Sequence, residues 1–216
     1  MGTEVSDRTK RDFDSINYQV AVQRIQAAAD IAKGQGNVLV LAYSGGKDSD
    51  VLLDLAIKSG IRFEVQHNLT TVDAPETVFY IRGVFARLNS LGIKTAINSP
   101  VEIVTASGKT ERASMWNLIV KKQIPPMRNA RYCCEFFKER SFEGQHVLLG
   151  VRWSESYKRK KRGLHETIHR KKEARIVFYD ENDDKRKLTE ICRLRARIAT
   201  NPIIDWTDAD VFCYIT

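Results

Sequence analysis

The sequence predicts an α/β protein in which helices flank a mainly parallel sheet, in three layers. Short apolar runs alternate with longer segments of helical periodicity, and this alternation is typical of βαβ units. The first run, residues 37–43, is almost entirely apolar, as expected for a strand buried on both faces of a parallel sheet. Glycine-rich or polar turns follow residues 43, 66 and 151, where an open parallel sheet binds its ligands.

Local signals place the individual elements. Asp14 or Ser15 can cap a first helix, which ends at Gly34 and Gly36. Pro75 suits the first turn of a long helix. The predicted strands are residues 37–43, 62–66, 94–97 and 146–151, and the predicted helices are residues 50–59, 75–91, a short segment from Ser114, and 132–140.

The last third of the chain has less regular patterns. Residues 157–172 are expected to form a basic loop or an exposed helix. Residues 175–179 and 192–198 are predicted strands, the second with one basic face because apolar and basic residues alternate in it. Thr207 is expected to cap a final helix.

We therefore expect a helical extension over residues 1–36 and one α/β domain over 37–216, with a basic excursion at about 153–200. The charge is local: residues 151–200 contain 16 Lys and Arg against 8 Asp and Glu, which accounts for the net charge of +8. No stretch approaches the roughly 20 apolar residues that cross a bilayer. Residues 1–14 lack the apolar segment of a secretory signal, so we expect a cytoplasmic protein without membrane contact.

The strongest chemical signal is the run S-G-G-K-D-S at residues 44–49, between the first predicted strand and a helix. Glycines let the backbone approach phosphate oxygens, and a helix N-terminus offers N–H donors and partial positive charge. The order of residues matches neither a Walker A loop nor G-x-G-x-x-G. A plain glycine turn capped by serine is the alternative, but the coincidence of strand, loop and helix favours a phosphate site.

Three further motifs follow the run at residues 44–49, in the order TVDAPET at 71–77, GVRWSES at 150–156 and PIIDWT at 202–207. With these four motifs the chain resembles the phosphoadenylyl-sulfate (PAPS) reductase family of PP-loop enzymes, in which the run at 44–49 is the PP-loop signature. The resemblance implies a Rossmann-like fold of the HUP/PP-loop type, and hence a PP-loop nucleotide-binding domain over residues 37–216.

The same resemblance implies that an adenine nucleotide, ATP or PAPS, binds with its phosphates at the loop. Asp48 would orient the loop or help to hold Mg²⁺, and we expect it to act in catalysis together with Lys47 and Arg152. The implied phosphate ligands are Ser44, Gly45, Gly46, Lys47 and Ser49.

Two other motifs supply candidate nucleotide ligands. Asp73 follows the second predicted strand and is expected near the ribose or the substrate, or else it caps the next helix. Gly150 and Arg152 lie at the end of another strand, and a guanidinium suits a phosphate or sulfate. Glu155 could hold Arg152 in place, or the two could form a surface ion pair.

The cysteines and the basic run leave several partners open. Cys133 and Cys134 are candidate iron–sulfur ligands, but a [4Fe–4S] cluster needs four thiolates, so we expect one only if a further cysteine pair lies beyond the chain end. The basic residues of 158–172 are expected to clamp the substrate or to bind nucleic acid, and a plain solvated surface is the third alternative. The oligomeric state is open, and a homo-oligomer is compatible with the sequence.

These observations support three hypotheses of function. The first is an enzyme of sulfur metabolism that binds and reduces a sulfonucleotide with a thioredoxin-like reductant, although the family's C-terminal E-C-G-x-H tail is missing. The second is an ATP pyrophosphatase that adenylates an acceptor for sulfur insertion, as in DNA phosphorothioation. The third is a nucleotide- or nucleic-acid-binding module without turnover. Because the last helical pattern stops abruptly at Thr216, we expect the chain to be truncated.

Overall fold

The structure of the chain is a computed structural model that describes residues 18–100, 102–104, 108–127, 132–139, 142, 144–157, 159–168, 177–178 and 197–216. The predicted helix cap at Asp14 or Ser15 and most of the predicted strand at 192–198 lie outside these residues. So does part of the basic run at 158–172.

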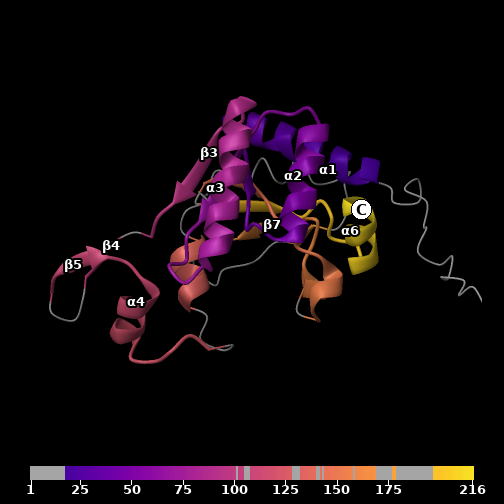
Figure 1. The fold of residues 1–216 in the computed structure, drawn as a ribbon. Helices are drawn as coiled ribbons and strands as arrows, with labels where there is room; N and C mark the ends of the chain where they lie inside the picture. Colours follow the sequence, from indigo (N-terminus) through magenta and orange to yellow (C-terminus); the bar gives the residue numbers. More distant parts are fainter. Residues whose placement is uncertain are drawn as a thin grey trace, which may run out of the picture.

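The described residues form a seven-stranded sheet with the order β3-β2-β1-β6-β9-β7-β8, and a separate two-stranded sheet of β4 and β5 (Figure 1). The first five strands in that order are parallel, whereas β7 and β8 run antiparallel to their neighbours. This confirms the predicted mainly parallel, Rossmann-like α/β fold. The strands are β1 Leu39–Ala42, β2 Phe63–Asn68, β3 Thr95–Asn98, β4 Glu102–Val104, β5 Thr110–Arg112, β6 His146–Leu148, β7 His165–Ile168, β8 Val177–Phe178 and β9 Arg197–Thr200.

Four of the described helices pack against one face of the large sheet, whereas α4 packs in a separate small cluster with Phe137. The main apolar cluster joins α1, α2, α3 and α6 to alternate residues of the strands, such as Leu39 and Leu41 of β1. Val40, which points to the other face, packs with Val147 and Phe142 instead. None of the described helices is long and apolar enough to span a membrane. The helices are α1 Tyr18–Gly34, α2 Lys47–Lys58, α3 Pro75–Ser90, α4 Met115–Lys122 and α6 Asp208–Ile215.

The first helix belongs to the core of the sheet domain. Ala21, Ile25 and Ala28 recur at helical spacing along α1, and each is completely buried in the main cluster. The predicted extension over residues 1–36 thus contains a helix that packs on the same sheet as the rest of the chain.

The strand order creates a crevice at the carboxyl edge of the sheet. From β1 the chain runs to β2 and β3 on one side, whereas β6 and β9 lie on the other side of β1. Connections that leave adjacent parallel strands in opposite directions open a crevice between them, and ligands bind there in α/β sheets. The predicted phosphate loop follows β1 and therefore lies at this position.

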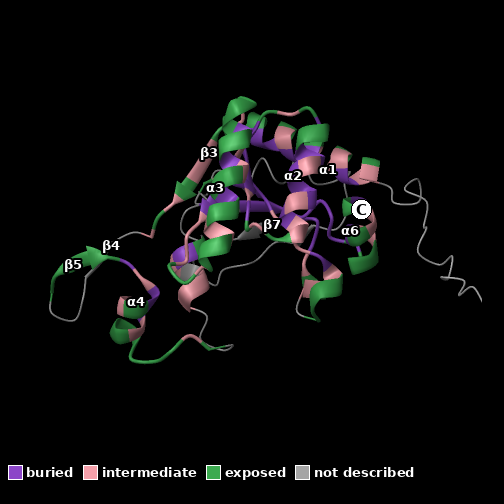
Figure 2. Cartoon of the chain, viewed as in Figure 1, coloured by how far each residue is buried: buried purple, intermediate pink, exposed green. Residues whose placement is uncertain are grey.

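An arm built from β4, β5 and α4 extends from the body of the domain and is largely exposed (Figures 1 and 2). Ser114 caps α4 as predicted, since its side chain accepts a hydrogen bond from the Asn117 amide. The β4–β5 hairpin was not predicted. The described side chains of β5 are exposed, so no apolar alternation marks the strand in the sequence.

Two predictions about the last third of the chain need correction. Residues 157–172, expected to be a loop or an exposed helix, contain the short helix η5, Arg159–Lys161, and the strand β7. His165 and Glu166 of β7 are buried. The strand escaped prediction because its buried side chains are polar: His165 bonds Thr200 of β9, and Glu166 accepts from Arg162 and the Gly163 amide. Thr207, by contrast, caps α6 as predicted and accepts a hydrogen bond from the Asp210 amide.

Two histidines are buried as neutral side chains between β6, β9 and β7. His146 Nε2 and His165 Nδ1 lie 2.6 and 2.8 Å from the same hydroxyl, Thr200 Oγ1. Burial lowers the pKa of His146 to about 3, with a further contribution from His165. Burial also lowers the pKa of His165 to about 4, with a contribution from Arg24.

This pair predicts a loss of stability in mild acid. The unfolded chain binds protons at its histidines below a pKa of about 6.5, whereas the folded chain does not until about pH 4. The free energy of unfolding should therefore fall as the pH drops from 7 to 5, by about 2 kcal/mol per histidine. Urea denaturation of the wild type and of His165→Gln at both pH values measures the effect. A pH dependence that is equal in the two proteins would contradict it.

Candidate nucleotide site

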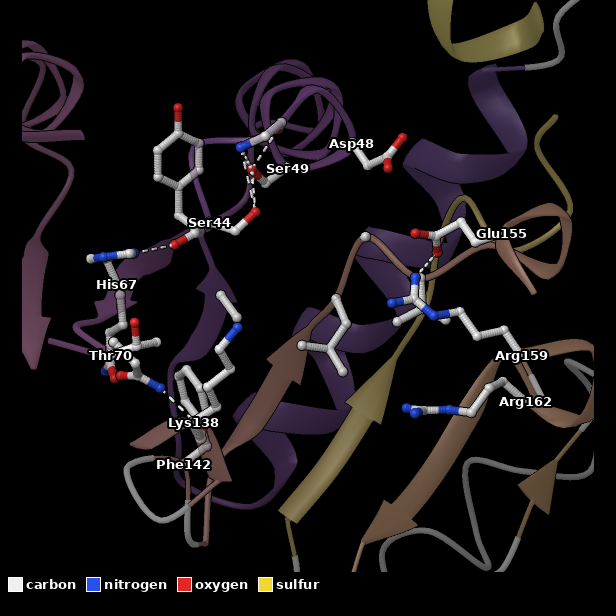
Figure 3. A pocket seen from close by; sticks show the side chains of 18 of the residues that line it. Ser44, Asp48, Ser49, His67, Thr70, Lys138, Phe142, Glu155, Arg159 and Arg162 are labelled. Atoms are coloured by element: carbon white, nitrogen blue, oxygen red, sulfur yellow. Dashed lines mark hydrogen bonds and ion pairs between the residues drawn. The ribbon is translucent and has the colours of Figure 1, made fainter. Parts of the chain in front are cut away.

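A cavity of about 580 Å³ opens at the carboxyl edge of the sheet. Its walls come from the ends of β1, β2 and β6 and from the segments that follow them. In the view of Figure 3, Ser44 and Ser49 lie at the top, Lys138 and Phe142 at the left, and Arg159 and Arg162 at the right. The cavity thus joins the predicted phosphate loop to the basic run of the last third of the chain.

The loop depends on the backbone freedom of glycine. Gly45 has a φ of +74°, in the left-handed region that side chains rarely adopt. A Cβ atom added there would lie 3.0 Å from Cγ1 of Ile81, a completely buried residue of α3. Gly45 therefore permits both the turn and the close approach of α3 to the loop.

Two hydroxyl groups shape the loop from inside. Ser44 Oγ and Ser49 Oγ are 3.2 Å apart, and the Gly46 amide donates to Ser49 Oγ at 3.1 Å. The Ser49 and Asp50 amides donate to the Gly46 carbonyl, which closes the first turn of α2. The amides before them in a helix have no intrahelical acceptor, so an anion can accept from them.

Gly150 brings the end of β6 against the start of α2. A Cβ atom at this position would lie 3.1 Å from the backbone oxygen of Asp48. Gly150 also lines the cavity. The predicted site residue thus lets two walls of the cavity meet closely.

Lys47, Asp48 and Arg152 come together in an ion-pair network. Arg152 is 1% exposed, and its Nε lies 3.0 Å from Asp48 while its Nη2 lies 2.8 Å from Asp208. Lys47 Nζ pairs with Asp48 at 3.0 Å and with Asp208 at 3.2 Å. Hydrogen bonds from Arg152 and Lys47 lower the pKa of Asp208. Of the three predicted catalytic residues, only Asp48 lines the cavity.

The predicted pairing of Arg152 with Glu155 differs from the observed one. Glu155 accepts a hydrogen bond of 3.0 Å from the backbone amide of Arg152, and its carboxylate pairs with Arg159 rather than with the Arg152 guanidinium. Glu155 lines the cavity, as the prediction of a nucleotide-site residue requires. Sequence proximity suggested the wrong partner, because the true partners of Arg152 lie on α2 and α6.

Asp73 lines the cavity but does not cap α3. The N-cap is Ala74, without a side-chain hydrogen bond. The Asp73 carboxylate instead accepts from the amide and the hydroxyl of Thr70, at 2.7 and 2.8 Å, which folds the turn after β2. The alternative role as a helix cap is therefore wrong.

The cavity includes residues that the motifs did not reveal. Lys138 of the short helix η2, Cys134–Glu139, is one of them, and no pattern in this irregular segment marks it. His67 is another: its Nδ1 lies 2.9 Å from the Tyr43 carbonyl, which fixes the ring at the end of β2. Asp208 does not line the cavity but belongs to the ion-pair network, and the sequence signal that could have revealed it is its position directly after the PIIDWT motif, at the start of α6.

The predicted metal ligands form no cluster in the described residues. Cys133 and Cys134 form no disulfide in the part of the chain that the structure describes, and no group of three His, Cys, Asp or Glu that could hold a metal ion occurs there. Asp48, the predicted magnesium contact, is paired with Lys47 and Arg152. A protein-held magnesium site does not fit this arrangement, so a magnesium ion that arrives with a nucleotide would rely on phosphate oxygens.

A glycine loop between a buried parallel strand and a helix, open to a cavity at the switch point of the sheet, defines a nucleotide-binding α/β domain. The chain belongs to the phosphoadenosine phosphosulfate reductase domain family, whose model matches residues 38–216. That match contains all of the predicted site residues. No curated protein matches the chain.

Proposed function

We propose that this chain is an enzyme of sulfur metabolism that binds an adenylyl nucleotide in the cavity, with the nucleotide phosphates at residues 44–49. The observation that carries the proposal is the loop itself: Gly45 in the left-handed conformation and two facing serine hydroxyls, at the N-terminus of α2 and on the cavity wall. The hydrogen bonds of these hydroxyls hold the loop in shape before a ligand arrives, and the first amides of α2 have no intrahelical acceptor, which favours anion binding.

In this proposal the site residues have two kinds of role. Ser44, Gly46 and Ser49 contact the phosphates, whereas Gly45 gives the loop its shape. Asp73, Gly150 and Glu155 form the walls beside the ribose and the remaining part of the ligand. Lys47, Asp48 and Arg152 hold the start of α2 in position and act on the reaction through the loop.

PAPS is the first candidate ligand, because the chain belongs to the phosphoadenosine phosphosulfate reductase domain family. Reduction of its sulfonyl group requires a thiol that attacks sulfur, and none of the described residues that line the cavity is a cysteine. A thioredoxin-like reductant or another thiol from outside these residues would supply the attack. Titration with PAPS, followed by assay for sulfite in the presence of reduced thioredoxin, tests this candidate.

ATP is the second candidate, as the substrate of a pyrophosphatase that adenylates an acceptor. The observation that favours it is the basic wall of Lys138, Arg159 and Arg162, which suits a polyphosphate. Exposed Lys160 and Lys161 of η5 could contact a nucleic-acid acceptor. ATP with Mg²⁺ should then yield AMP and pyrophosphate. If the chain binds PAPS or ATP but forms no product, it is a nucleotide-binding module without turnover. If it binds neither nucleotide, the proposal is refuted.

The loop hydroxyls provide a sharp test of the site. Ser44→Ala combined with Ser49→Ala should weaken nucleotide binding by roughly 100-fold or more, since each of the two hydrogen bonds to a charged group contributes about 1.5–3 kcal/mol. Ser90→Ala is the matched control, because Ser90 is exposed at the end of α3 and does not line the cavity. Isothermal titration calorimetry measures the affinities. Equal affinity in the double variant and the control would place the phosphates elsewhere.

A further inference from the structure

The helix of the arm, α4, has one buried face and one exposed apolar face. Met115 and Leu118 are buried in a cluster with Phe137 of η2, which anchors the helix. Trp116 and Val120, four residues apart on the outer face, are each 69% exposed. Tryptophan is highly buried on average in folded proteins, and an exposed apolar face on a packed helix marks a site of interaction.

Basic side chains accompany this outer face. Residues 108–127 contain four Lys and Arg against a single glutamate, and all five of these side chains are exposed. Lys121 and Lys122 continue the exposed surface at the end of α4, directly after Val120. Lys122 Nζ lies 6.0 Å from the ring centroid of Tyr132. The arm therefore presents aromatic rings together with positive charge, which fits a partner that carries negative charge and flat apolar groups.

The arm is bonded to the wall of the nucleotide cavity. The Met115 amide donates to Thr71 Oγ1 at 2.8 Å. Thr71 has a φ of +67°, a conformation that a β-branched residue adopts only where the surrounding structure enforces it. Its neighbour Thr70 lines the cavity, and so does Lys138, next to the Phe137 against which α4 packs. The outer face of α4 is thus held in a fixed position relative to the cavity.

The chemistry of this face favours single-stranded nucleic acid over a protein partner. The helix α4 has eight residues, so it is about 12 Å long. Its apolar face is small beside the roughly 800 Å² that each partner buries in a standard protein interface. Single strands, by contrast, stack unpaired bases on exposed aromatic rings while basic side chains contact their phosphates. Trp116 supplies such a ring, and Lys121 and Lys122 supply the charge.

We propose that the arm of β4, β5 and α4 is a docking surface for single-stranded nucleic acid, with a base stacked on Trp116 and phosphates at Lys121 and Lys122. The nucleic acid lies outside the cavity, and the bond between Met115 and Thr71 connects its platform to the cavity wall. The inference rests on the proposed function only for the purpose of docking, which is to supply the acceptor of the ATP candidate. Docking itself requires no nucleotide.

Fluorescence anisotropy of a labelled single-stranded DNA of roughly 16 nucleotides, with no ATP or PAPS present, measures docking. Trp116→Ala should weaken binding by about 5- to 100-fold, because the stacking platform is lost. Trp116→Phe should keep most of the affinity, whereas Trp116→Leu, which is apolar without a ring, should not. Phe79→Ala is the matched control, since Phe79 is also 69% exposed but lies on α3, outside the arm.

The salt dependence of binding tests the phosphate contacts. Lys121→Gln combined with Lys122→Gln should reduce the slope of log affinity against log salt concentration by about 0.7 to 1.4, since each contact with a single strand contributes about 0.7. Arg82→Gln, at an exposed position of α3, should leave the slope unchanged. The urea midpoint of Trp116→Ala should equal that of the wild type, because the side chain is exposed.

Three results would overturn the docking surface. They are a wild type that binds no single strand, equal affinity in Trp116→Ala and Phe79→Ala, and full affinity in Trp116→Leu. Sedimentation velocity adds a fourth: self-association of the wild type that Trp116→Ala abolishes, without a change in DNA binding, assigns the face to a second copy of the chain. Calorimetric titration with ATP and PAPS, without DNA, is a separate measurement, and failure there refutes the proposed function but not the docking surface.

Discussion

Replacement of Gly45 by alanine is expected to abolish measurable nucleotide binding and to lower the free energy of unfolding by about 2–5 kcal/mol. The φ of +74° at this position costs an L-residue about 1–2 kcal/mol. The new methyl group would also lie 3.0 Å from Ile81 Cγ1, and overpacking of a buried contact costs about 1–3 kcal/mol. Relief of either strain moves the loop, and with it the amides and hydroxyls that would hold the phosphates.

Gly83→Ala is the matched control for this substitution. Gly83 is exposed within α3, and an added Cβ atom would meet nothing within 4 Å. Alanine should stabilise the helix there by about 0.5–1 kcal/mol, with unchanged nucleotide affinity. Urea denaturation and calorimetric titration measure both quantities.

A third variant separates the two sources of strain at Gly45. Ile81→Val added to Gly45→Ala shortens the neighbouring side chain but leaves the positive φ, so it should restore stability only in part. Wild-type affinity in Gly45→Ala alone would show that the phosphates do not depend on the conformation of this loop.

The features predicted correctly are those whose causes are local in the sequence. The succession of strand, glycine turn and helix at β1 and α2 could be predicted from an apolar run, a glycine pair and a helix start, all within residues 37–59. Capping by Ser114 and Thr207 is equally local, because each side chain bonds an amide three residues later. Such signals can be seen without knowing which segments meet in space.

Features that depend on distant partners were missed or misassigned. Arg152 was paired with Glu155, three residues away, whereas its guanidinium contacts Asp48 and Asp208, 104 and 56 residues away. His165 looked like an exposed basic-segment residue, yet it is buried because Thr200 offers a hydroxyl from β9. Polar side chains carry no periodic burial signal when their partners lie on other elements.

The Arg152 network leads to the second large prediction. Arg152→Met is expected to lower the free energy of unfolding by about 2–4 kcal/mol, since removal of one member of a buried ion pair leaves the other charges uncompensated. This loss of unfolding free energy is smaller than the loss expected for a fully buried ion pair, because the Asp208 side chain is 64% exposed. Arg152 also connects the segment after β6 to the starts of α2 and α6, so nucleotide affinity should fall as well.

Variants of its partners distinguish a holding role from direct chemistry. Asp208→Asn keeps an oxygen acceptor for Arg152 and is more exposed, so its effect on stability should be less than about 1 kcal/mol. When Arg152→Met and Asp208→Asn are combined, the loss of unfolding free energy should be smaller than the sum of the two single losses, because both substitutions remove the same contact. If Arg152→Met instead unfolds like the wild type and binds nucleotide normally but forms no product, the guanidinium contacts the reacting groups directly. A network that holds the start of α2 requires stability and affinity to fall together.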